Sequence, residues 1–238
     1  MKKLLFLPAA LLILAGCTSP VATTTTAPYE SGAPSTDAAP SQSVAPPAAG
    51  TVACSYAETG DASKPVSTPA ASDVPATGTV DYVMTLNDAP ITLTLDRELA
   101  PCTVNSFTSL ADQGYFDGTV CHRVTDAGIF VLQCGDPSGT GRGGPGYTIP
   151  DEFEKIPGYP AGVLAMANTG APNSGGSQFF IVYAESPLPP QYTVFGTMDE
   201  AGVAQVAEIA AGGNDGSFGA AGGGAPNLPA DIASIAAA

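Results

Sequence analysis

The residues with the clearest chemical potential lie together in the stretch CHRVTDAGIFVLQCGD, residues 121–136. It contains His122, the only histidine of the chain, and next to it Arg123, one of 7 lysines and arginines among 238 residues. An arginine is always protonated and offers several N–H donors in a planar fork. When such a fork is fixed among apolar residues, it can stabilise charge or a lone pair that develops during a reaction.

Other kinds of chemistry find little support in the sequence. The glycine-rich run GTGRGG, residues 139–144, lacks the strand, the lysine and the helix that complete a phosphate-binding loop. One histidine and no CxxC spacing argue against a metal site. We therefore predict no metal and no cofactor, and we interpret the run as a surface loop beside a binding groove.

The charge of the chain excludes another class of function. Seven basic residues stand against 22 acidic ones, which gives a formal net charge of -15 and a pI near 4.1. Nucleic-acid binding requires clustered lysine and arginine to neutralise phosphates. We predict no nucleic-acid partner, and an acidic, well-hydrated surface.

Short strands and two helices must position Arg123. Alternating apolar and polar residues predict a hairpin around Asn87–Pro90 and a second one around Asp126–Gly128. Helical spacing puts apolar residues on one face of two segments, residues 100–116 (Val104, Phe107, Leu110, Ala111) and residues 199–211 (Val203, Val206, Ile209). Further strands are predicted within residues 162–170, 176–184, 192–198 and 229–237. Many short strands with two helices are typical of a closed antiparallel barrel capped at its ends.

Four motifs in order give this domain a family resemblance: HRV…IFVLQCGDPSGTGRGG, GVLAMANTG, NSGGSQFFI and YTVFG. Over roughly residues 79–235 the chain resembles a cyclophilin, a peptidyl-prolyl isomerase. The resemblance implies a mainly β fold, a closed antiparallel eight-stranded barrel capped by two helices. It also implies an enzyme that accelerates rotation of X–Pro bonds, with proline-containing polypeptides as partners.

The resemblance assigns roles to individual residues. Arg123 is the expected catalytic donor, Gln133 the residue that orients it, and Gln178 and Asn168 hold the substrate backbone. The remaining substrate-binding residues form an apolar slot for proline and its rim: Phe130, Val131, Ala167, Thr169, Phe180, Leu188 and Tyr192. Phe130 and Phe180 also fit a plain barrel core. His122 should point to the opposite face from Arg123 and fill a structural role.

The sequence departs from the family in two respects and leaves other functions open. The chain has no tryptophan, although many cyclophilins carry one near the position of Pro187, and Tyr192 stands where histidine is frequent. The alternative to an active isomerase is a low-turnover chaperone module that binds proline peptides. A scaffold lipoprotein is the third possibility.

The start of the chain predicts export. Residues 1–16 combine two lysines with an apolar run and small residues, as in a secretory signal, and Leu14–Cys17 resembles a bacterial lipobox. We predict lipidation of Cys17 and a location on the extracytoplasmic side of the cell membrane. A plain signal peptide or an uncleaved anchor are the alternatives. Residues 17–77 are interpreted as a disordered Thr/Ser/Ala/Pro-rich tether, and residues 78–238 as the folded domain.

Four cysteines remain after Cys17. In an oxidising compartment Cys54, Cys102, Cys121 and Cys134 can form two disulfides in three connectivities. One bridge should join two of the last three, and the third of them should hold Cys54 against the domain.

Overall fold

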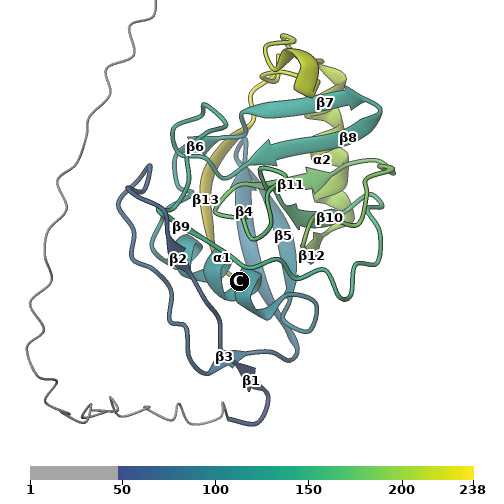
Figure 1. Cartoon of the computed structure of the whole chain (residues 1–238). Coiled ribbons are helices and arrows are strands. Elements are labelled where there is room, and N and C mark those ends of the chain that lie inside the picture. The colour runs from purple at the N-terminus through teal and green to yellow at the C-terminus, as the bar shows by residue number, and fades with distance from the viewer. Residues whose placement is uncertain (1–47) are drawn as a thin grey trace, which may run out of the picture. The chain divides into compact units, whose positions relative to one another are not determined.

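The computed structural model describes residues 48–238 of the chain (Figure 1). Its largest element is a curled nine-stranded sheet in which every pairing is antiparallel, in the order β6-β13-β4-β5-β12-β10-β11-β8-β7. The strands of this sheet are β4 (Thr79–Leu86), β5 (Ala89–Asp96), β6 (Thr119–Val120), β7 (Arg123–Ala127), β8 (Ile129–Cys134), β10 (Val163–Met166), β11 (Phe179–Val182), β12 (Val194–Met198) and β13 (Asp231–Ala237). The mainly β class is as predicted.

The first predicted hairpin is confirmed as β4–β5. Alternation puts one set of side chains of each strand into the core, among them Met84 and Leu93, which are fully buried. The turn falls at Asn87 and Asp88, whose φ angles are +48° and +66°. Asparagine and aspartate tolerate this left-handed conformation, which matches the twist of a two-residue hairpin.

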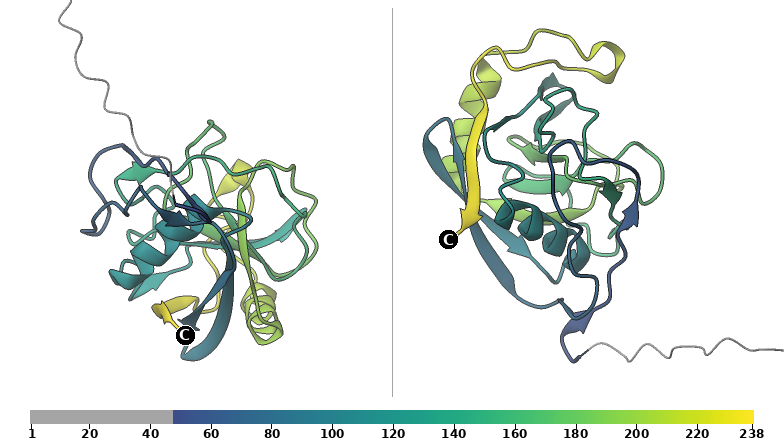
Figure 2. Two further views of the ribbon diagram at one scale, coloured as in Figure 1. Left: turned by 90° about the horizontal axis from the view of Figure 1, so that it is seen from below. Right: turned by 90° about the vertical axis from the view of Figure 1, so that its left-hand side faces the viewer.

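Two helices pack into the same core from different sides of the sheet (Figures 1 and 2). Helix α1 (Pro101–Asp112) begins with a proline in its first turn, where a missing N–H has no cost, and it buries Phe107 and Leu110 as predicted. Helix α2 (Glu200–Ala211) begins after Asp199, whose carboxylate accepts a hydrogen bond from the Gly202 N–H at 2.7 Å. A three-residue 3-10 helix, η1 (Gly219–Ala221), follows in the loop before β13.

The expected closed, eight-stranded barrel needs revision. The sheet has nine strands, because the two-residue strand β6 adds to the edge of β13. The edge strands β6 and β7 do not pair with each other in the described residues, so the structure does not confirm closure. They are consecutive in the chain and are separated only by Cys121 and His122, so the sheet curls round until one continuous segment forms both of its edges.

The predicted tether was too long at its C-terminal end. Residues 48–77, here called the strap, lie against the domain and contain β1 (Thr51–Val52), β2 (Ala57–Glu58) and β3 (Val74–Pro75). Strand β1 pairs with β3, and β2 pairs with β9 (Tyr147–Thr148). Val74 is 2% exposed, and Val52, Tyr56 and Val66 also pack against the core, so apolar contacts add to these strand pairings in holding the strap.

Two disulfides join Cys54 to Cys102 and Cys121 to Cys134. This confirms the expected pattern, in which Cys54 holds the strap to the first helix. Within residues 48–238 there is no helix long and apolar enough to cross a membrane. The predicted signal peptide, residues 1–16, and the predicted lipidation site, Cys17, lie outside the described residues.

Candidate active site

Arg123 stands at the start of β7, directly opposite Gln133 on β8. Its side chain is half-buried, and Nη1 donates a hydrogen bond to Gln133 Oε1 at 3.1 Å. Adjacent antiparallel strands bring directly opposed side chains within reach of each other, so this pairing follows from the register of the hairpin. The arginine and the glutamine expected to orient it therefore lie together.

A line of side-chain amides continues from this pair. Gln133 Nε2 donates to Gln178 Oε1 at 2.8 Å, and Gln178 Nε2 donates to the Gly143 carbonyl, also at 2.8 Å. Arg123 has only donors, so it requires the oxygen of Gln133 on its side, which fixes the direction of the next amide as well. The orientation of the guanidinium is thereby coupled to the glycine-rich loop.

The Arg123 guanidinium keeps its positive charge free of a carboxylate partner in its hydrogen bonds. Its three acceptors are the Gln133 amide oxygen and the main-chain carbonyls of Ala221 and Gly222, all uncharged. Burial lowers the pKa of Arg123, yet an arginine stays protonated at neutral pH. The group is thus a fixed, uncompensated positive charge at half-buried depth.

An apolar pocket of about 180 Å³ lies beside this guanidinium. Val131 and Phe180, which are 3% and 5% exposed, lie at its most buried part, and the Phe180 ring meets Tyr192 edge-on at 5.3 Å. The pocket brings together most of the predicted site residues: Arg123, Val131, Gln133, Ala167, Asn168, Phe180, Leu188 and Tyr192. Its walls and depth suit a small apolar ring.

Two of the remaining predicted residues lie in a second, wider groove of about 670 Å³. Thr169 and Gln178 line this groove, which shares Gln133, Ala167 and Asn168 with the apolar pocket. Thr59 and Asp61 of the strap also line this groove, although both fall within residues 17–77, for which the sequence predicts a disordered tether. An extended peptide seated in the pocket can therefore continue along the groove.

Phe130 does not line the pocket, which corrects one prediction. Because side chains alternate along a strand, Ile129, Val131 and Gln133 share one face of β8 and Phe130 takes the other. The ring of Phe130 lies against Tyr183, with centroids 5.9 Å apart, and Ile129 lines the pocket in its place. The period of two along the strand was a signal that could have found Ile129.

Sequence interpretation also missed Phe218. This residue lines the pocket, and its ring centroid is 5.6 Å from Cζ of Arg123. It lies in a run dominated by glycine and alanine, in which it is the only large side chain between residues 213 and 224. A single large side chain among glycines and alanines was the only signal in the sequence that pointed to Phe218. The spacing of residues in this run does not indicate that it lies near Arg123.

His122 lies behind the site and lines neither the pocket nor the groove. It is 4% exposed, and neither ring nitrogen has a hydrogen-bond partner. Burial lowers the pKa of His122 more strongly than the nearby Asp136 carboxylate raises it. The neutral ring packs near Phe218, at 6.2 Å between centroids.

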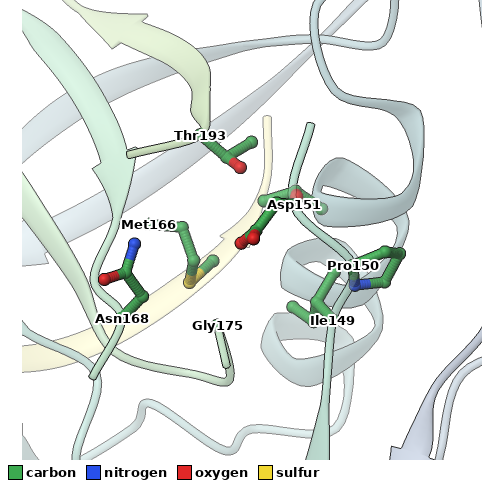
Figure 3. Close-up of a pocket in the computed structure, with 8 residues that line it drawn as sticks. Ile149, Pro150, Asp151, Met166, Asn168, Gly175 and Thr193 are labelled. Atoms are coloured by element: carbon green, nitrogen blue, oxygen red, sulfur yellow. The ribbon is translucent and has the colours of Figure 1, made fainter. Parts of the chain in front are cut away.

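A further hollow shares Asn168 but has no room for a water molecule (Figure 3). Figure 3 shows Met166, Asp151 and Thr193 around it, next to a helix. It is a packing gap beside the site. Among residues 48–238 no group of three His, Cys, Asp or Glu side chains is placed to hold a metal ion.

Comparison with known proteins places residues 81–235 of the chain in a family. The family described as cyclophilin type peptidyl-prolyl cis-trans isomerase/CLD matches residues 81–235. A probable peptidyl-prolyl cis-trans isomerase B from Mycobacterium leprae is 48% identical over 177 residues, which cover 68% of this chain and 60% of that protein. The Mycobacterium tuberculosis protein of the same name is 46% identical over 198 residues, which cover 76% of this chain and 62% of the relative. The matches thus span less than two thirds of the length of these relatives.

Solved structures agree with the fold. A crystal structure of a cyclophilin type peptidyl-prolyl cis-trans isomerase from Cryptosporidium parvum superposes with a TM-score of 0.58 at 29% identity, covering 68% of this chain and 98% of that one. The same protein was also solved in the presence of the dipeptide Ala-Pro, and that structure matches with a TM-score of 0.56 at 28% identity, covering 66% of this chain and 98% of that one.

Proposed function

This chain belongs to the cyclophilin-type peptidyl-prolyl cis-trans isomerase family, and on that premise we propose that it accelerates cis–trans rotation of X–Pro bonds in polypeptides. The observation that carries the proposal is the uncompensated guanidinium of Arg123 at the wall of an apolar pocket. Both features are needed for catalysis. The pocket binds the proline ring but does not lower the barrier to rotation, and the guanidinium can donate to the imide nitrogen only when the ring is held beside it.

The reaction requires little from the protein except a hydrogen-bond donor close to the imide nitrogen. Resonance gives the peptide C–N bond double-bond character, with a barrier of about 18–20 kcal/mol. In the twisted transition state this resonance is lost, and the lone pair of the imide nitrogen becomes localised on that nitrogen. A donor aimed at that nitrogen stabilises the twisted form more than either planar form, which lowers the barrier. Arg123 has more N–H donors than its three acceptors use, so a donor remains for the substrate.

The substrate side of the proposal follows from the pocket. The proline ring enters the apolar part formed by Val131 and Phe180, and the backbone of the peptide runs past Asn168 and Gln178 into the groove. The Cryptosporidium relative was crystallised in the presence of Ala-Pro, which supports a proline-containing ligand. The pocket holds the proline ring in place while the preceding residue rotates about the X–Pro bond. This positioning keeps the imide nitrogen close to Arg123 during the rotation.

The test compares the full-length wild type with Arg123→Ala in an isomerisation assay on a short X–Pro peptide. We expect kcat to fall by roughly a hundredfold, the usual order for loss of one transition-state donor. Arg123→Lys should stay well below the wild type, because a lysine cannot reproduce the planar fork. Arg97→Ala, a cation outside the pocket, is the control and should match the wild type. Equal rates for the wild type and Arg123→Ala would refute the assignment.

One observation favours a second candidate, a chaperone module that binds proline peptides with little turnover. The carbonyls of Ala221 and Gly222 already occupy two donor positions of the guanidinium, Nη2 and Nε. If catalysis needs those positions, the peptide binds but does not rotate faster. The isomerisation assay, combined with a measurement of peptide binding, distinguishes the two candidates. A wild type that binds the peptide without accelerating cis–trans exchange supports the second candidate.

We also propose that the protein is exported and anchored by lipid at Cys17, on the extracytoplasmic side of the cell membrane. The lipobox-like Leu14–Cys17 supports this, and so do the two disulfides, since such bonds persist in oxidising compartments. In a lipoprotein-processing bacterium, the wild type should incorporate labelled palmitate and remain with the membrane fraction. Cys17→Ser should lose both properties, and a labelled Cys17→Ser protein would overturn the proposal.

A further inference from the structure

The loop between α2 and β13 folds onto Arg123. We call residues Gly213–Asn227 the arginine loop; Figures 1 and 2 show its course between the two elements. At its base the Asn227 N–H donates to the Gly213 carbonyl at 3.0 Å. Further out, Val124 and Gly224 exchange two main-chain hydrogen bonds, at 2.8 and 3.1 Å, which fix the loop to β7.

The arginine loop has a defined internal structure despite its composition. One oxygen of the Asp215 carboxylate accepts hydrogen bonds from the N–H groups of Ser217, at 2.9 Å, and Ala225, at 2.8 Å. Gly223 has φ +72°, and a Cβ there would lie 2.1 Å from the Val124 carbonyl oxygen. Only glycine allows the loop to approach β7 this closely, so the docking is specified by the sequence.

The tip of the loop contacts the guanidinium from two directions. The Gly222 carbonyl accepts from Arg123 Nε at 2.9 Å, and the Ala221 carbonyl accepts from Nη2 at 2.5 Å. The Phe218 ring covers the guanidinium at 5.6 Å, within the range of a cation–π contact. These contacts limit the directions in which the remaining N–H groups can point.

Phe218 lies at the rim of the apolar pocket. Its side chain is half-buried, whereas Val131 and Phe180 are almost fully buried. Behind it lie His122 and Gly141, where a Cβ would come within 3.2 Å of the Phe218 ring. With the proline ring in the buried part, a residue flanking the proline meets the rim, and this backing keeps Phe218 in place.

Resting on the proposed function, we propose that the arginine loop is part of the substrate site and determines its specificity. Phe218 selects apolar side chains next to the proline, and the carbonyls of Ala221 and Gly222 position Arg123 for the transition state. The loop therefore has two roles: Phe218 forms one side of the substrate site, and the two carbonyls orient the Arg123 guanidinium.

The first experiment measures kcat and KM of the full-length chain with a series of X–Pro peptides in which X is Gly, Ala, Leu or Phe. For Phe218→Ala, kcat/KM should fall roughly five- to tenfold with Leu and Phe, mainly through KM, and less than about twofold with Gly. Phe218→Leu should recover much of the loss. Leu228→Ala removes an exposed apolar side chain just outside the loop and should match the wild type with every peptide.

The second experiment tests the positioning role. Gly223→Ala should release the loop from β7, which removes both carbonyls from Arg123 and lowers kcat severalfold with all peptides. In NMR spectra the Arg123 Nε–H, which donates to the Gly222 carbonyl, should exchange slowly in the wild type and in Leu228→Ala, and rapidly in Gly223→Ala. An unchanged signal and unchanged kcat in Gly223→Ala would overturn the positioning role.

The outcomes separate this inference from the proposed function. An inactive wild type refutes the proposed isomerase activity. The specificity role of Phe218 is then tested by comparing the dissociation constants of the wild type and Phe218→Ala across the peptide series. An active wild type with a uniform change, or no change, across the series in Phe218→Ala overturns the specificity role alone. A loss confined to Leu and Phe, absent in Leu228→Ala, supports it.

Discussion

At the residue scale, the orientation of Arg123 depends on an amide that cannot be reversed. Gln133 accepts from the arginine and donates to Gln178, so each end of its amide has a single suitable partner. A flipped amide would face Arg123 with an NH₂ group and leave two donors in contact. The network therefore specifies one geometry of the guanidinium.

Gln133→Leu should lower kcat by roughly tenfold or more with little change in KM. The substitution removes a hydrogen bond to a charged group, of the order of 1.5–3 kcal/mol, while Val131 and Phe180 still hold the ring. Steady-state kinetics on an X–Pro peptide measures both constants. Gln205→Leu on α2 is the matched control, and a similar loss there would show that the effect is general destabilisation.

His122 makes the stability of the fold depend on pH. Its pKa is lowered in the folded state by burial, so below the ordinary histidine pKa of about 6.5 the unfolded chain binds more protons than the folded one. Stability from this group is therefore present at neutral pH and lost as the pH falls through about 6.5. Asp136 and Arg123 are the charged groups that act on the ring.

Urea unfolding at about pH 7.5 and about pH 5.5 should show a loss of stability in the wild type that is smaller in His122→Phe. Phenylalanine has a ring of similar shape and no proton to gain. The carboxylates titrate in both proteins, so the difference between the two losses isolates the histidine. Equal losses would contradict the assignment of the pH effect to His122.

At the element scale, sequence periodicity predicted the parts that bury their own apolar faces. The β4–β5 hairpin and α1 carry regular apolar spacing, and both were predicted with their buried faces. The strap and the arginine loop carry no such pattern. Their positions depend on a disulfide, on turns that require glycine and on main-chain hydrogen bonds to distant strands, which leave no periodic trace.

The same distinction explains what was predicted of the site. Motif resemblance brought together Arg123, Gln133 and Phe180, since they lie in two of the motifs that carry the resemblance, HRV…IFVLQCGDPSGTGRGG and NSGGSQFFI. It missed Phe218, which lies on a loop, and it misplaced Phe130, where strand alternation should have overruled the motif.

Removal of the strap disulfide should lower stability without abolishing the chemistry of Arg123. The Cys54–Cys102 bridge spans 48 residues, and loss of a bridge of this kind costs about 2–4 kcal/mol. The double variant Cys54→Ser/Cys102→Ser should unfold at a lower urea concentration and retain most of its kcat on short peptides. An unchanged unfolding midpoint would show that the strap adds nothing to the stability of the domain.

At the scale of the whole molecule, the acidic surface should steer substrates by charge. The chain has 22 acidic and 7 basic residues, whereas the groove itself is lined by one residue of each sign, Asp61 and Arg142, so the steering comes from the surrounding surface. Peptides with lysine beside the X–Pro pair should therefore show a severalfold higher kcat/KM than those with glutamate at about 20 mM salt. The ratio should approach one at about 500 mM salt, because the Debye length becomes short. If this ratio of kcat/KM values does not change with salt concentration, the preference for lysine arises from direct contacts with the peptide and not from long-range steering.

The bridge between Cys54 and Cys102 also changes what a protease can do to the chain. A single cut anywhere between these two cysteines leaves two pieces that remain covalently joined. A cut within the strap after Cys54 therefore does not by itself separate the N-terminal segment from the domain. Separating the two pieces after a cut there requires a reductant as well, whereas a cut before Cys54 separates the N-terminal segment from the domain directly.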